Sequence, residues 1–420
     1  MVFEFFSANK EFLVFIIILT IFLYIKRKNL EVQGKFPFFY ILMYKTKLGL
    51  GKMDLWSKKH PKVFLFLSYL SIFIGVIGLF FSLWFMVYQL GFIVEYDLKE
   101  GGGLVLPIKT ESGSIAGIPV VAPPFFEWFI ALMILVIVHE FAHGVIAERF
   151  KIKIKSSGFA FMGLIAPLLP AAFVEPDEKY LKKAKWWQQI AVFGAGSTSN
   201  FIFGGLFLLI FFFVANPFMY ETTQLESISF TSVMNESSLK NYGIESGEII
   251  ALNYEPISNF DFIVGNGMGP GMSDLIIIPD FYNFTKNQTI LLTINTNNLV
   301  SIYEIQTFQL EEYGNKSMIG ISGFQPNLET KDDYLYLGGF PKFFQGLIFW
   351  IALLNIGIGL MNLLPIWITD GGQIAKTLLA NFIRNEKIVI SILNWISLLS
   401  LIMIIFIMFP ALLKSFVALF

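Results

Sequence analysis

Long runs of apolar residues constrain the fold of this chain more than any other feature of its sequence. Six runs are long enough, or nearly long enough, to cross about 30 Å of hydrocarbon as helices. They cover residues 8–25, 63–92, 125–147, 188–215, 343–365 and 386–413. The chain is 55% hydrophobic and only 15% charged, which leaves too little polar surface for a soluble protein of 420 residues. We therefore expect a polytopic α-helical membrane protein with about six transmembrane helices, the first being the shortest.

A further apolar run, residues 158–173, does not have the character of a span. Gly163, Pro167 and Pro170 interrupt it, and proline breaks a helix because it lacks the backbone N–H. Backbone that is not helical is tolerated at membrane depth only where it is buried against protein. A short hairpin or re-entrant segment is therefore expected here.

Basic residues indicate the orientation of the chain in the cell membrane. Residues 26–62, 148–187 and 366–387 hold 21 of the 30 Lys and Arg residues, and six crossings place all three segments on one face. By the positive-inside rule that face is cytoplasmic. The first basic cluster follows the first apolar run instead of preceding it, so we expect a retained span and not a signal peptide. The net charge of −1 gives no indication of nucleic-acid binding.

The long segment 216–341 is then expected on the extracytoplasmic side. It holds four lysines, no arginine and fifteen acidic residues, and its hydrophobicity falls into short alternating stretches separated by Gly, Asn and Pro. This pattern predicts a soluble, strand-rich domain. The Asn-x-Ser/Thr sequons of the chain also lie here, at Asn235, Asn283, Asn287 and Asn315. Their position agrees with an extracytoplasmic location, although an Asn-rich segment also collects sequons by chance.

The chain is accordingly expected to have four parts. Residues 1–62 would form the first transmembrane helix and a cytoplasmic basic segment, and residues 63–215 the first half of the membrane core. Residues 216–341 would form the extracytoplasmic domain, and residues 342–420 the second half of the membrane core.

A pair of histidines in the third apolar run indicates a metal site. His139 and His143 are two of only three histidines, and Glu140 completes the pattern HExxH. Residues four apart share one face of a helix, so both imidazoles can bind one zinc ion, while Glu140 can take a proton from a water on the metal. The alternative is a pair of core histidines that only make hydrogen bonds. Ionisable groups inside a membrane are costly and favour a functional site.

Two histidines leave such a site incomplete, and Asp370 is the best candidate for a third ligand. The chain has no cysteine, so a carboxylate has to serve. Pro365 interrupts the fifth run, and the following Gly371 and Gly372 permit a tight turn. The alternative is that Asp370 only caps the helix expected at residues 373–382.

The depth of the two motifs in the membrane agrees with a shared site. At 1.5 Å per residue from Phe125, His139 lies about 21 Å from the extracytoplasmic side, in the cytoplasmic half of the bilayer. Asp370 follows the cytoplasmic end of the fifth run. The competing carboxylates lie in a basic cytoplasmic loop and are expected to stay solvated; they are Glu175, Asp177 and Glu178.

These motifs resemble the site-2 proteases. The matching stretches are His139-Glu-Phe-Ala-His143, Ala172-Phe-Val-Glu-Pro-Asp177, Gly194-Ala-Gly-Ser-Thr-Ser-Asn200, and Asn362-Leu-Leu-Pro365 with Asp370-Gly-Gly372. The resemblance covers almost the whole chain and looks closest to archaeal members with a PDZ-like insert. It implies a zinc metalloendopeptidase that cuts membrane-anchored proteins within or near their transmembrane segments, in regulated intramembrane proteolysis. It also implies that Asp370 is the third zinc ligand.

The resemblance implies a catalytic role for Asn200 as well. In the family the fourth span carries Gly-Pro-x-x-Asn, and the Asn is thought to bind the substrate or the oxyanion. Here Ser197 replaces the proline, so the local geometry departs from the family pattern. A simple hydrogen bond between helices remains the alternative for Asn200.

Within the insert, the stretch Gly243-Ile-Glu-Ser-Gly-Glu-Ile-Ile250 resembles a turn and strand of PDZ domains, with Glu248 in place of the commoner Asp. A PDZ-like domain could bind an extended peptide at a sheet edge or filter substrates by size. A generic β-rich spacer is the alternative. Two other functions stay open at this point: a catalytically silent membrane scaffold that binds peptides through this domain, and an unrelated membrane metalloprotease with a Glu as third ligand.

Overall fold

The computed structural model describes residues 2–34, 40–98, 101–110, 114–115, 118–163, 167–257, 263–265, 275–277, 285–296, 299–309, 317–323 and 325–417. The chain forms two compact units. One consists of Met1–Ile210 and Gly346–Phe420, and the other of Phe211–Gln345. Two of the sequons, Asn283 and Asn315, lie outside the described residues.

Among the described residues, five helices are long and apolar enough to cross a membrane. They are α4 (Pro61–Glu95), α5 (Phe125–Arg149), α7 (Trp186–Ile210) continued by a π-helical turn (Phe211–Ala215) and α8 (Asn216–Thr222), α9 (Phe340–Met361) and α11 (Glu386–Met408). The first predicted span forms α2 (Lys10–Ile25), which follows α1 (Val2–Ala8) and has 16 residues. That length falls just short of the ~17 residues that a spanning helix needs.

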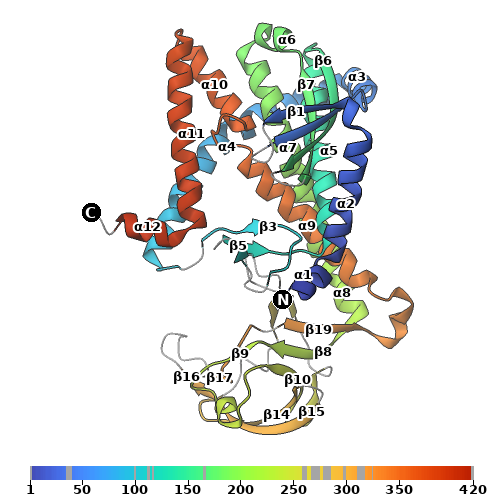
Figure 1. The fold of residues 1–420 in the computed structure, drawn as a ribbon, viewed down its shortest axis with the longest axis vertical. Coiled ribbons are helices and arrows are strands. Elements are labelled where there is room, and N and C mark those ends of the chain that lie inside the picture. The colour runs from blue at the N-terminus through green and yellow to red at the C-terminus, as the bar shows by residue number, and fades with distance from the viewer. Residues whose placement is uncertain are drawn as a thin grey trace. The chain divides into compact units, whose positions relative to one another are not determined.

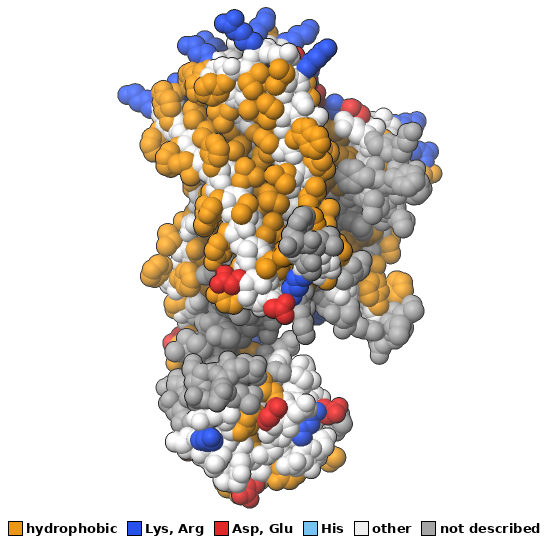
Figure 2. Space-filling view, turned by 90° about the vertical axis from the view of Figure 1, so that its left-hand side faces the viewer, with side chains coloured by type: hydrophobic (Ala, Val, Ile, Leu, Met, Phe, Trp, Pro, Cys, Tyr) orange, Lys and Arg blue, Asp and Glu red, His pale blue; other side chains and the backbone are white. Residues whose placement is uncertain are grey.

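The helices of the first unit present an apolar flank. Figure 2 shows hydrophobic side chains over most of this face, with Lys and Arg side chains gathered at one end. Inside the unit, α7 packs against α4 and α5 through small residues. The Cα atoms of Gly75 and Gly194 lie at the α4–α7 contact, and a Cβ on Gly194 would overlap the carbonyl oxygen of Ser71. Small residues let helix backbones approach closely where no hydrophobic effect drives them together.

A four-stranded antiparallel sheet lies beside these helices (Figure 1). Its strands are β1 (Leu30–Gly34), β2 (Tyr40–Thr46), β6 (Ile154–Gly163) and β7 (Pro167–Pro176), in the order β1-β2-β6-β7. The pair β6-β7 confirms the hairpin expected at residues 158–173. Strands β1 and β2 were not predicted from the basic segment that contains them, and they leave β7 at one edge of the sheet.

Shorter elements complete the first unit. They are the 3-10 turn Arg27–Asn29, α3 (Leu50–Lys59), α6 (Glu178–Lys183), α10 (Asp370–Phe382), α12 (Pro410–Val417), β3 (Leu104–Val105), β4 (Ser114–Ile115) and β5 (Ile118–Val121). The three short strands form a small sheet in the order β3-β5-β4, at the end of the helices opposite α6 and α10 (Figure 1). Asn9 fixes this region because its side chain exchanges hydrogen bonds with the backbone of Lys109.

The second unit is rich in strands, as the sequence predicts. Its main sheet has the path β15 (Leu299–Gln306), β14 (Thr289–Thr296), β10 (Gly247–Leu252), β8 (Thr223–Phe230) and β19 (Gln325–Thr330), with β11 (Glu255–Pro256) beside β10. Short pairs join β12 (Ile263–Gly265) to β13 (Leu275–Ile277), β16 (Phe308–Gln309) to β17 (Ser317–Met318), and β18 (Ile321–Ser322) to β9 (Ser232–Val233). Among its described residues, Ser238–Tyr242 and Asp332–Leu337 form 3-10 helices.

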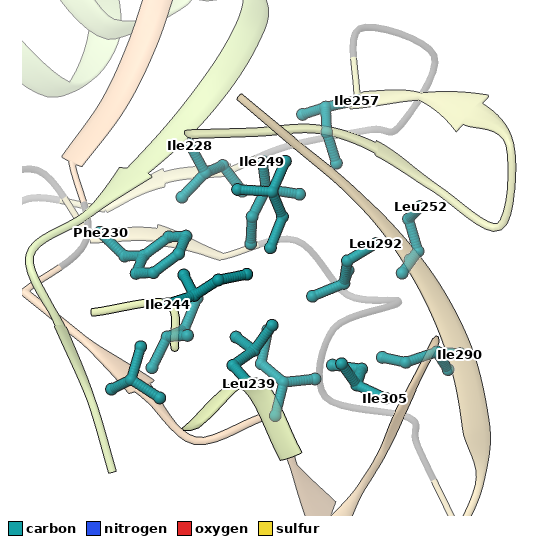
Figure 3. Packing of buried hydrophobic residues seen from close by; sticks show 14 of the residues in the cluster. Ile228, Phe230, Leu239, Ile244, Ile249, Leu252, Ile257, Ile290, Leu292 and Ile305 are labelled. Atoms are coloured by element: carbon teal, nitrogen blue, oxygen red, sulfur yellow. The ribbon is translucent and has the colours of Figure 1, made fainter. Parts of the chain in front are cut away.

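One face of this sheet forms the hydrophobic core of the second unit. Alternate residues of β14 point into it, so Ile290, Leu292 and Ile294 are fully buried, and Ile249 of β10 packs beside them (Figure 3). The predicted turn at Gly243 ends a 3-10 helix with a φ of 71°, a left-handed conformation that glycine adopts without strain. The likeness of this unit to PDZ domains remains a prediction.

Candidate metal centre

Helix α5 holds the two histidines of the HExxH motif on one face. The Nε2 atoms of His139 and His143 lie 3.1 Å apart, and both side chains are buried. The Nδ1 atom of His143 lies 2.6 Å from the carbonyl oxygen of Val192 on α7. A carbonyl oxygen only accepts hydrogen bonds, so Nδ1 of His143 carries a proton and its Nε2 atom offers a lone pair.

Asp370 brings a carboxylate to the same point from the other half of the chain. Its Oδ2 atom lies 3.2 Å from Nε2 of His139 and 3.3 Å from Nε2 of His143. Asp370 is the first residue of α10, and the hydroxyl of Thr369 caps that helix by accepting from the N–H of Gly372 at 3.3 Å. The capping alternative for Asp370 is therefore wrong.

The turn before α10 holds Asp370 against the histidines. A Cβ on Gly371 would overlap the carbonyl group of Leu363, so this glycine is needed for close approach of the backbone and not for an unusual φ. The N–H of Gly371 donates to the carbonyl of Asn362 at 2.8 Å. From α11, the hydroxyl of Ser397 donates to the carbonyl of Pro365 at 3.0 Å. These bonds tie the turn to its neighbours, which fixes the direction of the Asp370 side chain.

Gly196 gives the two histidines the room they need. It lies on α7 against both rings, and a Cβ at this position would overlap ring atoms of His139 and His143. That Cβ would stand 2.5 Å from Nε2 of His139, on the side where the ligand atoms meet. The sequence assigned no role to this residue; its one signal was the glycine of the Gly-x-x-x-Asn pattern that ends at Asn200.

The three ligand atoms fit a zinc ion. Ligands about 2.0–2.1 Å from zinc at tetrahedral angles lie about 3.3 Å from one another. The separations among Nε2 of His139, Nε2 of His143 and Oδ2 of Asp370 are 3.1, 3.2 and 3.3 Å. The Oδ2 atom is buried and makes no other hydrogen bond. Lone pairs that converge in this way repel each other unless a cation or shared protons lie among them.

Glu140 is half-buried one residue after His139. Its Oε2 atom accepts a hydrogen bond from the backbone N–H of Val174 on β7, over 2.7 Å. This bond joins the edge strand of the sheet to the helix that carries both histidines. It orients the carboxylate and leaves Oε1 for another donor.

A comparison with known protein families agrees with a metal site formed by these residues. The sequence model described as Peptidase family M50 covers residues 127–409, a range that includes His139, Glu140, His143 and Asp370. The chain belongs to this family. Its members are zinc metallopeptidases, so the resemblance to site-2 proteases is confirmed. Family membership and the five apolar helices together indicate a membrane protein.

A protein of an archaeon is similar to this M50 chain over most of its length. The uncharacterized protein MJ0971 of Methanocaldococcus jannaschii is 28% identical over 388 residues, which are 87% of this chain and 84% of the relative. The similarity therefore extends over both units and not only over the metal-binding motifs.

The competing carboxylates of this M50 chain have other partners. Glu175 accepts from the hydroxyl of Ser156 at 2.7 Å and pairs with Lys45 at 3.3 Å; the Ser156 hydrogen bond and then Lys45 lower the pKa of Glu175. Asp177 caps α6, and Glu178 pairs with a lysine one turn later. Within the described ranges, His139, His143 and Asp370 are the group of three that could hold a metal ion.

Asn200 lies in the same cluster but turns away from solvent. It is fully buried on α7, and the Nδ2 atom of its amide lies 3.1 Å from Nδ1 of His139. Helix α7 runs unbroken through Ser197, the residue that replaces the family proline, and Ser197 is fully buried too. The structure therefore places Asn200 behind a histidine ring.

Proposed function

We propose that this chain is an intramembrane zinc metalloendopeptidase that hydrolyses peptide bonds within or near the transmembrane segments of membrane-anchored proteins. The observation that carries the proposal is that Asp370 of α10 meets His139 and His143 beside Glu140, and that these last three residues lie on a helix long and apolar enough to span a membrane. Ionisable groups in such a helix are costly to bury, which favours a functional reason for them.

His139, His143 and Asp370 would hold the zinc ion in this proposal. When bound, zinc acidifies a coordinated water and polarises the peptide carbonyl. Glu140 acts as the general base that accepts the proton of the attacking water, and it then gives that proton to the leaving amine as the C–N bond breaks. The N–H of Val174 keeps Glu140 in place through both transfers, because it donates to Oε2 and leaves Oε1 free.

The substrate has to be extended at the cut, because an intact helix ties up its own carbonyl groups. Strand β7 offers an edge for such a segment. The N–H of Val174 points away from β6 and toward Glu140. Backbone N–H groups alternate in direction along a strand, so every second residue of β7, counted from Val174, directs its backbone toward the same outer edge. Pro170 and Pro176 have no N–H, which leaves Ala172 as the outward donor of this stretch.

An extended peptide beside β7 would lie next to Glu140. It would accept a hydrogen bond from Ala172 and donate to the outward carbonyls of the strand, as in other cases of strand addition. Substrates with residues that weaken a helix near the cut would open more easily.

This proposal places the metal centre toward the cytoplasm and the second unit on the extracytoplasmic side, in agreement with the distribution of basic residues. The second unit would then act on substrates as a PDZ-like module.

The Glu140→Gln variant tests the proposal. Gln keeps the size and one acceptor but cannot take a proton, so zinc content should stay at the wild-type level while cleavage of a membrane-anchored substrate in vesicles falls by ~10²-fold or more. Turnover at the wild-type rate in this variant would exclude the mechanism. A wild-type protein without zinc and without proteolysis would favour the silent peptide-binding scaffold.

A further inference from the structure

The amide of Asn200 is an unexplained polar group beside the metal ligands. It is fully buried and within hydrogen-bond distance of Nδ1 of His139, but its Oδ1 atom has no hydrogen-bond partner. Among the described residues, the hydrogen-bond contact of this side chain is the one with His139. The contact with His139 is therefore the part of its environment that needs a reason.

The tautomer of His139 supplies that reason. Its Nε2 atom faces Nε2 of His143 and Oδ2 of Asp370, so a metal there needs the lone pair of Nε2. A neutral imidazole has one N–H. When Nε2 offers its lone pair to a metal, the proton of His139 lies on Nδ1, and this N–H needs an acceptor. The oxygen and nitrogen of an amide have the same shape, so the hydrogen bonds decide which one faces the ring. With Oδ1 toward Nδ1, Asn200 accepts the proton that metal binding requires at that position.

We infer that Asn200 is a positioning residue that holds His139 in the tautomer able to bind the metal, and that α7 supplies such an acceptor to both histidines. The carbonyl of Val192 does the same for His143 at 2.6 Å. Val192 and Asn200 lie eight residues apart on α7, on either side of Gly196, where the helix touches both rings. One helix thus orients both imidazoles from behind, as outer partners of metal-bound histidines do.

This inference rests on the proposed zinc site and assigns Asn200 a different role from that of an oxyanion ligand. The same amide can also serve the metal-free site, with Nδ2 donating to an unprotonated Nδ1 while Nε2 of His139 donates to Asp370. The amide then turns over when the metal binds. An oxyanion ligand, in contrast, would affect turnover and leave the metal affinity unchanged.

Metal affinity of the full-length protein in detergent separates these roles. Asn200→Leu removes the acceptor at similar size, and Asn200→Asp restores an acceptor at the same place. Asn355→Leu is the matched control, because Asn355 is equally buried in α9 and donates within its own helix to Ile351 at 2.8 Å. Zinc affinity is measured by competition with a chelator, and the ligand environment by the absorption spectrum after replacement with cobalt.

We expect Asn200→Leu to lower zinc affinity by about 10- to 100-fold and to alter the cobalt spectrum. Asn200→Asp should recover most of the affinity, and Asn355→Leu should match the wild type. Wild-type affinity and spectrum in Asn200→Leu would overturn the inference, as would equal loss in the Asp and Asn355 variants. A wild-type protein that binds no zinc would instead contradict the proposed function itself, so the two failures are distinguishable.

Discussion

The backbone N–H of Val174 donates a hydrogen bond to the carboxylate of Glu140 over 2.7 Å. This bond links strand β7, at the edge of a four-stranded sheet, to helix α5, one residue from His139. The group proposed to move the proton is therefore anchored on the same strand that offers an edge to an extended peptide. Strand β7 is thus bonded directly to Glu140, which lies next to the metal ligand His139 on α5.

If β7 binds the substrate, Ala172→Pro should weaken substrate binding. Proline removes the outward N–H of Ala172 and suits this edge, where Pro170 and Pro176 already lie. One lost hydrogen bond of ~1–1.5 kcal/mol corresponds to about a tenfold rise in KM. Kinetics on a reconstituted substrate measure this, with Ala172→Val as the control that keeps the N–H. Unchanged KM in the proline variant, at normal zinc content, would argue against strand addition.

Gly196→Ala should abolish metal binding. The added methyl group overlaps ring atoms of His139 and His143, and both rings are buried. We expect zinc content below one tenth of the wild-type value, measured by elemental analysis of the purified protein. Gly205→Ala is the control, because a Cβ on Gly205 of the same helix meets nothing within 4 Å. Full zinc occupancy in Gly196→Ala would mean that the metal lies elsewhere.

Asp370→Asn should lower zinc affinity, whereas Glu175→Gln should not. The first change removes the charge of a buried oxygen that faces both imidazoles, and an amide is a poorer zinc ligand than a carboxylate. The second change affects a carboxylate that already binds Ser156 and Lys45. We expect a loss of at least about tenfold for Asp370→Asn in chelator competition. The reverse result would support a glutamate as third ligand.

Ser397→Ala should loosen the turn that carries Asp370. The Ser397 hydroxyl donates to the carbonyl of Pro365 from α11, and its loss leaves a buried carbonyl oxygen with one partner fewer. A cost of about 1 kcal/mol predicts roughly fivefold weaker zinc binding. Ser400→Ala is the matched control: Ser400 is equally buried on the same helix, but its hydroxyl donates to Ile396 within that helix. Equal affinities in the two variants would show that this tie does not position Asp370.

The sequence determined those parts of the fold that depend on local chemistry. Apolar runs gave the five long helices, because a membrane imposes both their length and their composition. Pro167, Pro170 and Gly163 excluded a further span and predicted a hairpin. Strand β2 escaped prediction because its pairing partner β6 lies more than a hundred residues later in the chain, and β1 is joined to the sheet through β2.

The same division holds for the metal centre. That His139 and His143 share a face, with Glu140 beside them, follows from the helical repeat alone and needs no tertiary contact. Only the tertiary structure brought Oδ2 of Asp370 within 3.3 Å of both rings, and only it showed the contacts of Gly196, Val174 and Asn200. These contacts join segments far apart in sequence through packing and hydrogen bonds, which no local pattern of residues encodes.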